Sequence, residues 1–362
     1  MKSFEKLGDW LNRAVTGGLG DGRTSKLKTC QGSHVKRPKV CPISTGAVAI
    51  AVGLISLLNS DATTFAAGVS VSVNRYGDVS IVGDSLNNDI KIERVSDTLA
   101  RLSGSSTKIN NSYNYFEFDP NHNISIALNG GPDTVTLQGT SVAKPLKFAS
   151  ITIQGGDGTD RFTINNVYTT GAMTLDMGGG VSTVDEEFAR ITGTNIGSFS
   201  FRTDRTAPAT FGTAGHDNLY LTSCTIRGSA TLTGGNALNE MYFNSTLVQG
   251  NVQVVMGNET NQTRFMTDYF ATSNCTIDGA LSVSTGEGWG RVNLNNTKAA
   301  SITVVMGTSG SDEIWLYNVT AKTGSFDGGT GGADVIQGTG NRFTSSPQVK
   351  NIERNTLKWT ST

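Results

Sequence analysis

The chain has 362 residues and a formal net charge of −1, and it contains 44 glycines but only 7 prolines. Glycine is therefore enriched above its usual ~7% without the proline of a collagenous or Pro-Gly-rich disordered chain. From Ala67 onward there are 20 Lys/Arg and 26 Asp/Glu, a net charge of −6. Nucleic-acid binding needs a clustered basic face, so this composition gives no case for a nucleic-acid partner.

Residues 1–66 are predicted to be an export leader. Residues 1–42 hold 9 Lys/Arg and 3 Asp/Glu, and residues 43–58 are apolar. As a helix this apolar segment would rise about 24 Å, short of the ~30 Å hydrocarbon core. The pattern predicts a signal peptide cleaved after Ala66, with cleavage after Ala62 as the second choice. Alternatively, residues 43–58 remain as one N-terminal membrane anchor; both readings place residues 67–362 outside the cytoplasm.

Residues 67–123 are predicted to form an antiparallel β cap. Short alternating segments separated by turn residues suit hairpins. They are Val69–Val73, Val79–Ile81, Ile90–Ile92, Leu99–Leu102 and Tyr115–Phe118. A stack of strands needs its open end covered, because an uncovered edge pairs with other chains.

Residues 124–340 repeat a strand–turn–strand unit at irregular intervals of 21 to 31 residues. The expected first-strand starts are Ile126, Ile151, Met173, Phe199, Ala230, Val252, Leu281, Ile302 and Phe326. Such periods are too short for propeller blades of about 40 residues, and the Leu-rich consensus of leucine-rich repeats is absent. We therefore predict an all-β fold, a parallel β-solenoid of the right-handed β-helix type with about nine coils.

Two further patterns support this register. Many units close on a glycine: Gly171, Gly197, Gly228, Gly250, Gly279 and Gly324. Cys224 and Cys275 each lie four residues before such a glycine, and Thr246 takes that place in the intervening coil. Two coils separate the thiols by about 9.6 Å, beyond the ~7 Å limit for the Cα atoms of a disulfide. We therefore predict two inward, unpaired thiols.

One glycine-rich turn carries a metal-binding consensus. Residues 155–162 read Gly-Gly-Asp-Gly-Thr-Asp-Arg-Phe, with partial copies near residues 130, 215, 310 and 332. In this block the chain resembles bacterial exported proteins with haemolysin-type (RTX-like) glycine/aspartate repeats. The resemblance implies calcium as a structural ion. The candidate ligands are Asp133, Asp157, Asp160, Asp312 and Asp334.

The spacing of these copies leaves a second interpretation open. The family's calcium sites use copies nine residues apart, whereas here they lie about 22 to 95 residues apart. Only Asp133 with Asp160, and Asp312 with Asp334, are expected in adjacent coils. Alternatively, each glycine permits a tight turn and each aspartate accepts a hydrogen bond from a nearby backbone N–H.

Other candidate sites are weaker. Arg202, Asp204 and Arg205 lie in the longest coil, with Asp217 not far along the chain. This loop is the best candidate for an enzyme site, yet no lyase or glycosidase motif accompanies it. Residues 185–187 are expected to be a solvated acidic loop. The histidines His122 and His216 are expected in surface turns.

Aromatic residues offer a different kind of site. An exposed aromatic strip could stack on sugars, although residues on second strands equally suit outward ladders or the core. The residues are Tyr220, Tyr242, Trp289, Trp315 and Tyr317.

These patterns predict an exported, non-catalytic structural or adhesive protein of the bacterial cell surface or extracellular space. The alternative is a carbohydrate-active β-helix enzyme, either a polysaccharide lyase or a hydrolase. No catalytic or cofactor-binding residue is assigned, and structural Ca²⁺ is the one cofactor indicated. Expected partners are a surface glycan, matrix or another copy of the chain, with membrane contact only through residues 43–58 if uncleaved. Residues 341–362 are expected to cover the last coil.

Overall fold

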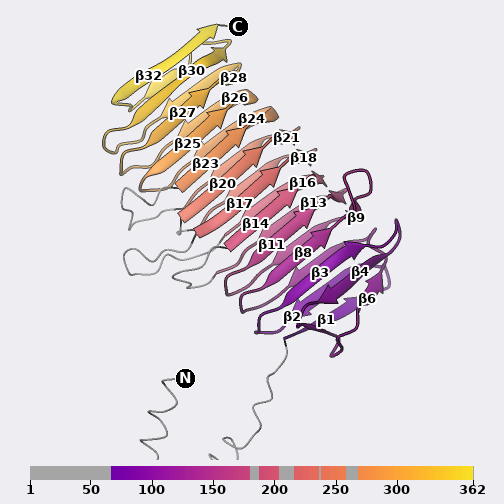
Figure 1. Ribbon diagram of the computed structural model, residues 1–362. Helices are drawn as coiled ribbons and strands as arrows, with labels where there is room; N and C mark the ends of the chain where they lie inside the picture. Colours follow the sequence, from indigo (N-terminus) through magenta and orange to yellow (C-terminus); the bar gives the residue numbers. More distant parts are fainter. Residues whose placement is uncertain (1–66, 180–186, 204–215, 236–237, 258–267, 362) are drawn as a thin grey trace, which may run out of the picture. The chain divides into compact units, whose positions relative to one another are not determined.

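The computed structural model describes residues 67–361, apart from 180–186, 204–215, 236–237 and 258–267. In that part of the chain all regular secondary structure is β, and successive strands stack as turns of a solenoid (Figure 1). The predictions for the leader, residues 1–66, lie outside the described residues. No helix in the described part is long and apolar enough to span a bilayer.

The coils form three faces, and each face is a stack of parallel strands; the first coil, β2 with β3, contributes only to the first and second faces. The first face comprises β2 (Val79–Gly83), β7 (Ile124–Ala127), β10 (Ile151–Gln154), β13 (Ala172–Asp176), β16 (Ser198–Arg202), β19 (Ala230–Thr233), β22 (Val252–Val255), the ends of β24 (Thr276–Ser284) and β26 (Lys298–Val305), β29 (Thr323–Asp327) and β31 (Gln348–Lys350). The second face comprises β3 (Asp89–Arg94), β8 (Thr134–Gln138), β11 (Arg161–Asn165), β14 (Glu187–Thr192), β17 (His216–Thr222), β20 (Leu238–Asn244), β23 (Asp268–Ser273), β25 (Gly290–Asn295), β27 (Glu313–Tyr317), β30 (Val335–Phe343) and β32 (Arg354–Ser361). The third face comprises β9 (Leu146–Phe148), β12 (Val167–Thr169), β15 (Asn195–Ile196), β18 (Thr225–Ile226), β21 (Leu247–Val248), the starts of β24 and β26, β28 (Thr320–Ala321) and the end of β30.

Antiparallel hairpins lie near the N-terminal end of the solenoid, as predicted. Strand β1 (Gly68–Val73) pairs antiparallel with β2, β4 (Ala100–Gly104) with β3, and β6 (Phe116–Phe118) with β4, while the short β5 (Lys108–Ile109) pairs parallel with β1. Strands β2 and β3 also pair parallel with β7 and β8. Strands β2 and β3 therefore belong both to the antiparallel hairpins and to the first coil of the solenoid.

The C-terminal residues extend the solenoid by a further coil. Strand β31 pairs parallel with β29, and β32 pairs parallel with β30. Most residues of β32 are exposed, and 38% of Trp359 is accessible. Among the described residues, β32 pairs with no strand on its other edge.

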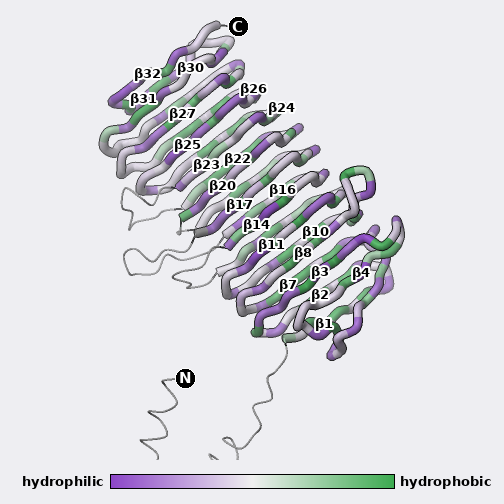
Figure 2. The backbone as a smooth tube through the Cα atoms, in the orientation of Figure 1, coloured by the Kyte–Doolittle hydropathy of each residue, from purple (hydrophilic) through white to green (hydrophobic). Residues whose placement is uncertain are grey.

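The core lies inside the coils, and period-2 alternation in the sequence creates it. Along the second face one inward column is fully buried: Ile90, Val135, Phe162, Ala189, Leu219, Met241, Phe270, Val292, Ile314 and Ile336. Figure 2 shows hydrophobic and hydrophilic residues alternating along the strands. Burying each large side chain contributes about 1.5–3 kcal/mol, so stacking the coils supplies the stability that no single coil has.

The pairing confirms seven of the nine predicted strand starts and corrects two. The start Ile151 lies beside Ile124, whereas Ile126 lies beside Ile153. At the other end Phe326 lies beside Val304. Both errors are shifts of two residues, which leave a side chain on the same face of a strand.

A single residue in a left-handed conformation turns the chain from the second face to the third. The turn residues and their φ angles are Asn166 (53°), Gly193 (59°), Ser223 (53°), Ser245 (50°), Asn274 (55°), Asn296 (46°), Asn318 (54°) and Gly340 (73°). Asparagine and glycine tolerate this conformation best. The recurring turn accounts for part of the high asparagine content.

The glycine corner predicted at the end of each unit is present in five of the six cases. The N–H groups of Gly197, Gly228, Gly250 and Gly279 each donate to the carbonyl of the corner glycine one coil earlier, and Gly171 donates to Ala149. A Cβ on Gly197 would lie 2.3 Å from the carbonyl oxygen of Gly171. Gly324 is different, because it lies within β29 beside Ile302.

The two cysteines belong to a buried column immediately after the left-handed turn. Its members are Val167, Thr194, Cys224, Thr246, Cys275, Thr297, Val319 and Asn341. The side chains of Cys224, Thr246 and Cys275 donate to the carbonyl two residues earlier, at 3.4, 3.1 and 3.3 Å. Both thiols are free and buried, which confirms the prediction.

We expect these thiols to be unreactive until the solenoid unfolds. Burial raises the pKa of Cys224 to about 11 and also raises the pKa of Cys275, and only the thiolate attacks disulfide reagents. The test is titration with a chromogenic disulfide reagent, using the full chain with Cys30→Ser and Cys41→Ser. The expected result is almost no reaction when native and two thiols in denaturant. Ser282→Cys on an outward position of β24 is the reactive control; equal native rates would refute the burial.

Candidate functional site

A column of polar side chains occupies the corner where the chain enters the second face. We call it the acidic ladder. The strand register aligns Asn88, Asp133, Asp160, Glu187, Asp217, Asn239, Asp268, Gly290, Asp312, Asp334 and Glu353. Every member from Asn88 to Asp334 is buried, and only Glu353 is exposed.

Five ladder aspartates bond to the backbone of the preceding coil. In each case Oδ1 accepts from the N–H of the ladder residue one coil earlier. The donor–acceptor distances are 2.6 Å for Asn88 to Asp133, 2.9 Å for Asp133 to Asp160, 3.0 Å for Asn239 to Asp268, 2.6 Å for Gly290 to Asp312 and 2.8 Å for Asp312 to Asp334. Each bond ties two successive coils together at this corner.

The second carboxylate oxygen of several ladder aspartates is buried and can be compared with the amide nitrogen of the ladder asparagines. The Oδ2 atoms of Asp133, Asp312 and Asp334 are buried and have no hydrogen-bond partner among the described residues. Where the ladder holds asparagine, the amide nitrogen donates to its own turn: Asn88 to the Leu86 carbonyl at 2.7 Å, and Asn239 to that of Gly235 at 3.1 Å. A protonated carboxyl can accept and donate in the same way.

The environment favours that protonated form. Burial, together with the neighbouring charge of Asp160, raises the pKa of Asp133 to about 7. Burial and the neighbouring charge of Asp334 likewise raise the pKa of Asp312 to about 7, and burial raises the pKa of Asp334. Hydrogen bonds from the backbone N–H groups oppose these shifts without cancelling them. At mildly acidic pH the carboxyl groups of Asp133 and Asp312 are therefore protonated.

The structure separates the five predicted calcium ligands into two groups. Asp133, Asp160, Asp312 and Asp334 are ladder members, and each predicted pair lies in adjacent coils. Asp157 is exposed in a turn outside the ladder, where it bridges to Gly130.

The ladder contacts bear on whether these residues suit calcium. Calcium takes six to eight oxygen ligands, whereas each ladder aspartate described above already has Oδ1 engaged by an N–H. In the described part of the chain no group of three or more His, Cys, Asp or Glu side chains is arranged to hold a metal. The alternative interpretation expected a backbone N–H of the same turn as the donor, whereas the donating N–H groups belong to the preceding coil. Calcium binding stays a prediction.

Several sequence predictions about charged residues need correction. Glu187 is fully buried in β14 and belongs to the ladder, so it is not part of a solvated loop. Asp217 is also buried in the ladder and does not face solvent beside Arg202, which is exposed on β16. His216 begins β17 and does not lie in a turn, whereas His122 does lie in the turn before β7.

The remaining residues of those predictions, 185, 186, 204 and 205, lie outside the described residues. The ladder itself was missed in the sequence, although a signal for it exists. Each member directly precedes the outward–inward alternation of a second-face strand, so aligning that single position exposes the column.

At Gly290 the ladder lacks a side chain, and a threonine five residues earlier takes the place of a glycine. In some other coils a glycine lies five residues before the ladder side chain and gives it room: a Cβ on Gly155 would lie 2.0 Å from Asp160 Oδ2, and one on Gly234 would lie 2.6 Å from Asn239 Cγ. In the Gly290 coil that position is Thr285. A Cβ on Gly290 would lie 2.7 Å from Thr285 Oγ1. Here the threonine fills the space that the ladder side chain occupies elsewhere.

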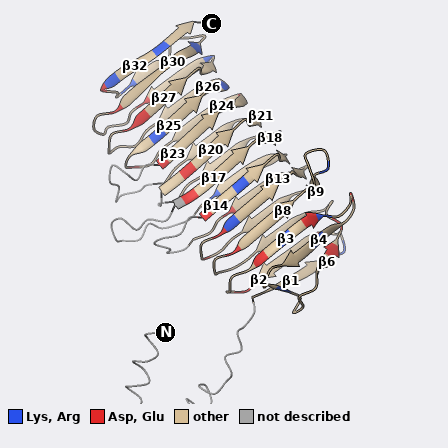
Figure 3. Cartoon of the chain, in the orientation of Figure 1, with Lys and Arg blue, Asp and Glu red and all other residues tan. Residues whose placement is uncertain are grey.

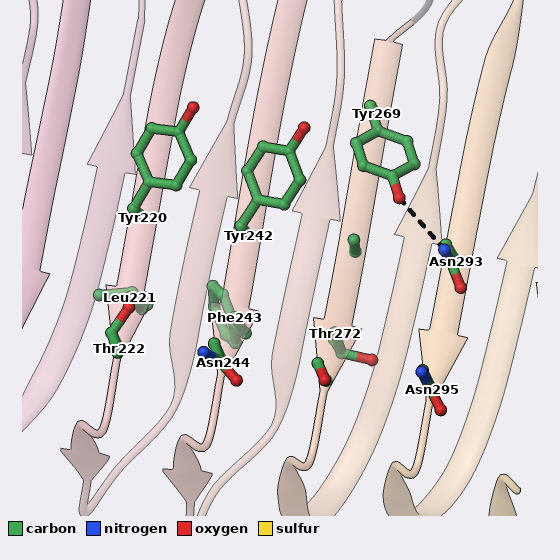
Figure 4. Close-up of a pocket in the computed structure, with 12 residues that line it drawn as sticks. Tyr220, Leu221, Thr222, Tyr242, Phe243, Asn244, Tyr269, Thr272, Asn293 and Asn295 are labelled. Carbon is green, nitrogen blue, oxygen red and sulfur yellow. Dashed lines mark hydrogen bonds between the residues drawn. The ribbon is translucent and has the colours of Figure 1, made fainter. Parts of the chain in front are cut away.

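The outer surface of the second face carries a groove across β17, β20, β23 and β25. We call it the tyrosine groove. It encloses about 410 Å³ and is lined by Tyr220, Leu221, Thr222, Tyr242, Phe243, Asn244, Tyr269, Ala271, Thr272, Ser273, Asn293 and Asn295. Figure 4 shows the three tyrosine rings side by side on neighbouring strands. None of the lining residues is charged, and Figure 3 shows only isolated charged residues on these strands.

A second depression lies further along the same face. It encloses about 450 Å³ and is lined by Trp289, Ser311, Glu313, Trp315, Ala333, Val335, Gln337 and Arg354. The Arg291 guanidinium lies 4.7 Å from the Trp315 ring and forms an ion pair with Glu313 at 2.6 Å. The predicted aromatic strip is thus divided between two depressions, and Tyr317 lines neither. Tyr269 was not foreseen, because Tyr220 and Tyr242 share a register that it does not share.

No protein-family model, curated protein or solved structure matches this chain.

Proposed function

We propose that this chain is an exported structural or adhesive β-solenoid protein that acts at the bacterial cell surface or outside the cell, without catalysing a reaction. The observation that carries the proposal is the second face. Its strands present continuous rows of outward aromatic, amide and hydroxyl side chains across many coils, interrupted only by scattered charges. A long regular face of this kind suits contact with an extended partner such as a glycan, the matrix or another copy.

The carboxylates support a scaffold more than an enzyme. Glycoside hydrolysis uses two carboxyl groups that face one glycosidic bond from opposite sides. In the described part of the chain the ladder aspartates lie close together, but they are buried and bonded to backbone N–H groups. Side chains arranged in this way hold coils together.

Export gives the first test of the proposal. When the full chain is produced in a bacterium, we expect residues 67–362 to be accessible to protease on intact cells, and we expect a mature N-terminus at Ala67 by mass spectrometry. The physical reason is the basic n-region followed by the short apolar segment 43–58. An intact chain in the membrane fraction, still accessible from outside, would indicate the anchored form.

The matched control carries Val52→Arg and Leu54→Arg, which interrupt the apolar segment and should retain the chain inside the cell. A soluble, uncleaved wild-type chain in the cytoplasm would overturn the proposed location. Release of reducing ends or unsaturated sugars from a polysaccharide panel by the purified chain would overturn its non-catalytic role.

A further inference from the structure

The hollow of the tyrosine groove arises from one small residue in an outward row. The row on the second face runs Arg190, Tyr220, Tyr242, Ala271, Asn293, Trp315 and Gln337. Ala271 stands where its neighbours have larger side chains, so the surface dips there. The register places Ala271 beside Tyr242 and two residues after Tyr269 on β23, and all three line the groove.

The tyrosine rings present part of their faces to this groove. The rings of Tyr220 and Tyr242 are parallel within 3°, with centroids 5.1 Å apart. The centroids of fully overlapped parallel rings lie closer together than this, so these two rings are offset from each other. The Tyr269 ring meets Tyr242 edge-on at 5.2 Å. Together they make an apolar platform that spans three coils.

Hydrogen bonds hold the platform in place before any ligand arrives. The Tyr242 hydroxyl donates to Glu240 Oε2 at 3.0 Å, and the Tyr269 hydroxyl accepts from Asn293 Nδ2 at 3.2 Å. A site already fixed in its binding conformation loses less entropy on association.

The polar groups of the groove are amides and hydroxyls. Asn244, Asn293 and Asn295 supply amides, and Thr222 and Ser273 supply hydroxyls. No charged side chain lines the groove itself. Two lie beside it and are engaged with the tyrosines: Glu240 accepts from the Tyr242 hydroxyl, and the Arg190 guanidinium lies 5.5 Å from the Tyr220 ring. An ionic ligand in the groove therefore gains little counter-charge. Aromatic ring faces with neutral donors and acceptors around them suit a ligand with apolar C–H faces and many hydroxyl groups.

We propose that the tyrosine groove binds an uncharged polysaccharide, which lies across β17, β20 and β23 with sugar rings against Tyr220, Tyr242 and Tyr269. This inference rests on the proposed function and specifies the ligand class and the site of that adhesive face. The three tyrosines lie on successive coils, so an extended sugar chain that runs along the stack of coils would pass over all of them.

The test is affinity electrophoresis of the purified full chain in native gels. The gels contain hydroxyethyl cellulose, galactomannan or dextran as uncharged polymers, and alginate or polygalacturonate as acidic ones. At least one uncharged polymer should retard the chain, and the acidic polymers should not. Tyr220→Ala with Tyr242→Ala should weaken the apparent Kd at least tenfold, because it removes two of the three rings of the platform.

A second variant keeps the test valid if loss of two tyrosines impairs folding. Ala271→Gln fills the hollow without removing any contact, and Gln337 already occupies the same outward row. It should also weaken binding at least tenfold with an unchanged melting temperature. Tyr76→Ala, at a 64% exposed tyrosine outside the groove, is the control and should bind normally.

Three results would overturn the inference: no retardation by any uncharged polymer, stronger retardation by acidic polymers, or an unchanged Kd in the folded Ala271→Gln variant. Failure here is distinguishable from failure of the proposed function. An exported chain that binds no polysaccharide refutes the groove alone. A chain that remains in the cytoplasm but binds through the groove refutes the location alone.

Discussion

Exchanging Asp312 for Asn is expected to raise the free energy of unfolding at pH 8 by on the order of 3 kcal/mol, with little effect at pH 4. The pKa of Asp312 rises from its ordinary 3.8 to about 7 on folding. Between these values the folded chain holds a proton that the unfolded chain has released, so the free energy of unfolding falls as pH rises. Asparagine keeps the acceptor for the Gly290 N–H and cannot ionise.

Urea unfolding followed by circular dichroism from pH 4 to pH 8 measures this effect. Wild-type stability should decline over that range, and Asp312→Asn should decline less. Asp157→Asn is the matched control, because Asp157 lies in an exposed turn outside the ladder and should change little.

The opposite outcome would point to calcium. If stability rises toward pH 8, falls on chelation and is restored by millimolar Ca²⁺, and if Asp312→Asn abolishes that response, the ladder binds the ion as ionised carboxylates. Binding to the folded state alone must raise the melting temperature, so the comparison with and without chelator is decisive.

Gly290→Asn alone is expected to destabilise the solenoid by about 3 kcal/mol, because the new side chain collides with Thr285 in a filled corner. Thr285→Gly alone should cost about 1–2 kcal/mol through the space it leaves and the flexibility of glycine. The double variant recreates the Gly234–Asn239 arrangement of an earlier coil. We expect it to recover at least half of the summed loss.

The double-mutant cycle isolates the coupling, which should exceed about 1 kcal/mol. The asparagine introduced in the double variant also gains a partner, since the Asp268 N–H now bonds to the Trp289 carbonyl at 3.1 Å and could turn to the new side chain. The control pair, Ser229→Gly with Thr231→Asn, lies outward and exposed on the first face and should be additive. An additive result at Thr285 and Gly290 would show that the two positions do not share one space.

The stacking of coils was predictable, but the register was only partly so. Alternation of inward residues identifies the strands, because it is a local property of the chain. It does not distinguish Ile124 from Ile126, or Gly324 from Phe326, since residues two apart point to the same side. Because the turns between strands differ in length from coil to coil, the spacing of the repeats cannot show whether a strand is aligned correctly or two residues out of register.

The candidate sites show the same division. The tyrosines of the second face were recognised as a strip, yet the groove depends on Ala271 standing between Tyr242 and Asn293. A small residue has no signal of its own in one sequence. Its meaning comes from the larger neighbours that the register places on each side.

By itself the sequence determined the all-β solenoid, the hairpins before it and the two unpaired thiols, because these follow from alternation and spacing along one chain. Only the tertiary structure decided whether the aspartates lie in exposed turns or in a buried column. A Gly–Asp turn read alone resembles an exposed calcium loop. Stacking brings N–H donors from 22 or 27 residues away against Asp334 and Asp160 and closes the corner to water. Those distant donors make the aspartates a buried ladder.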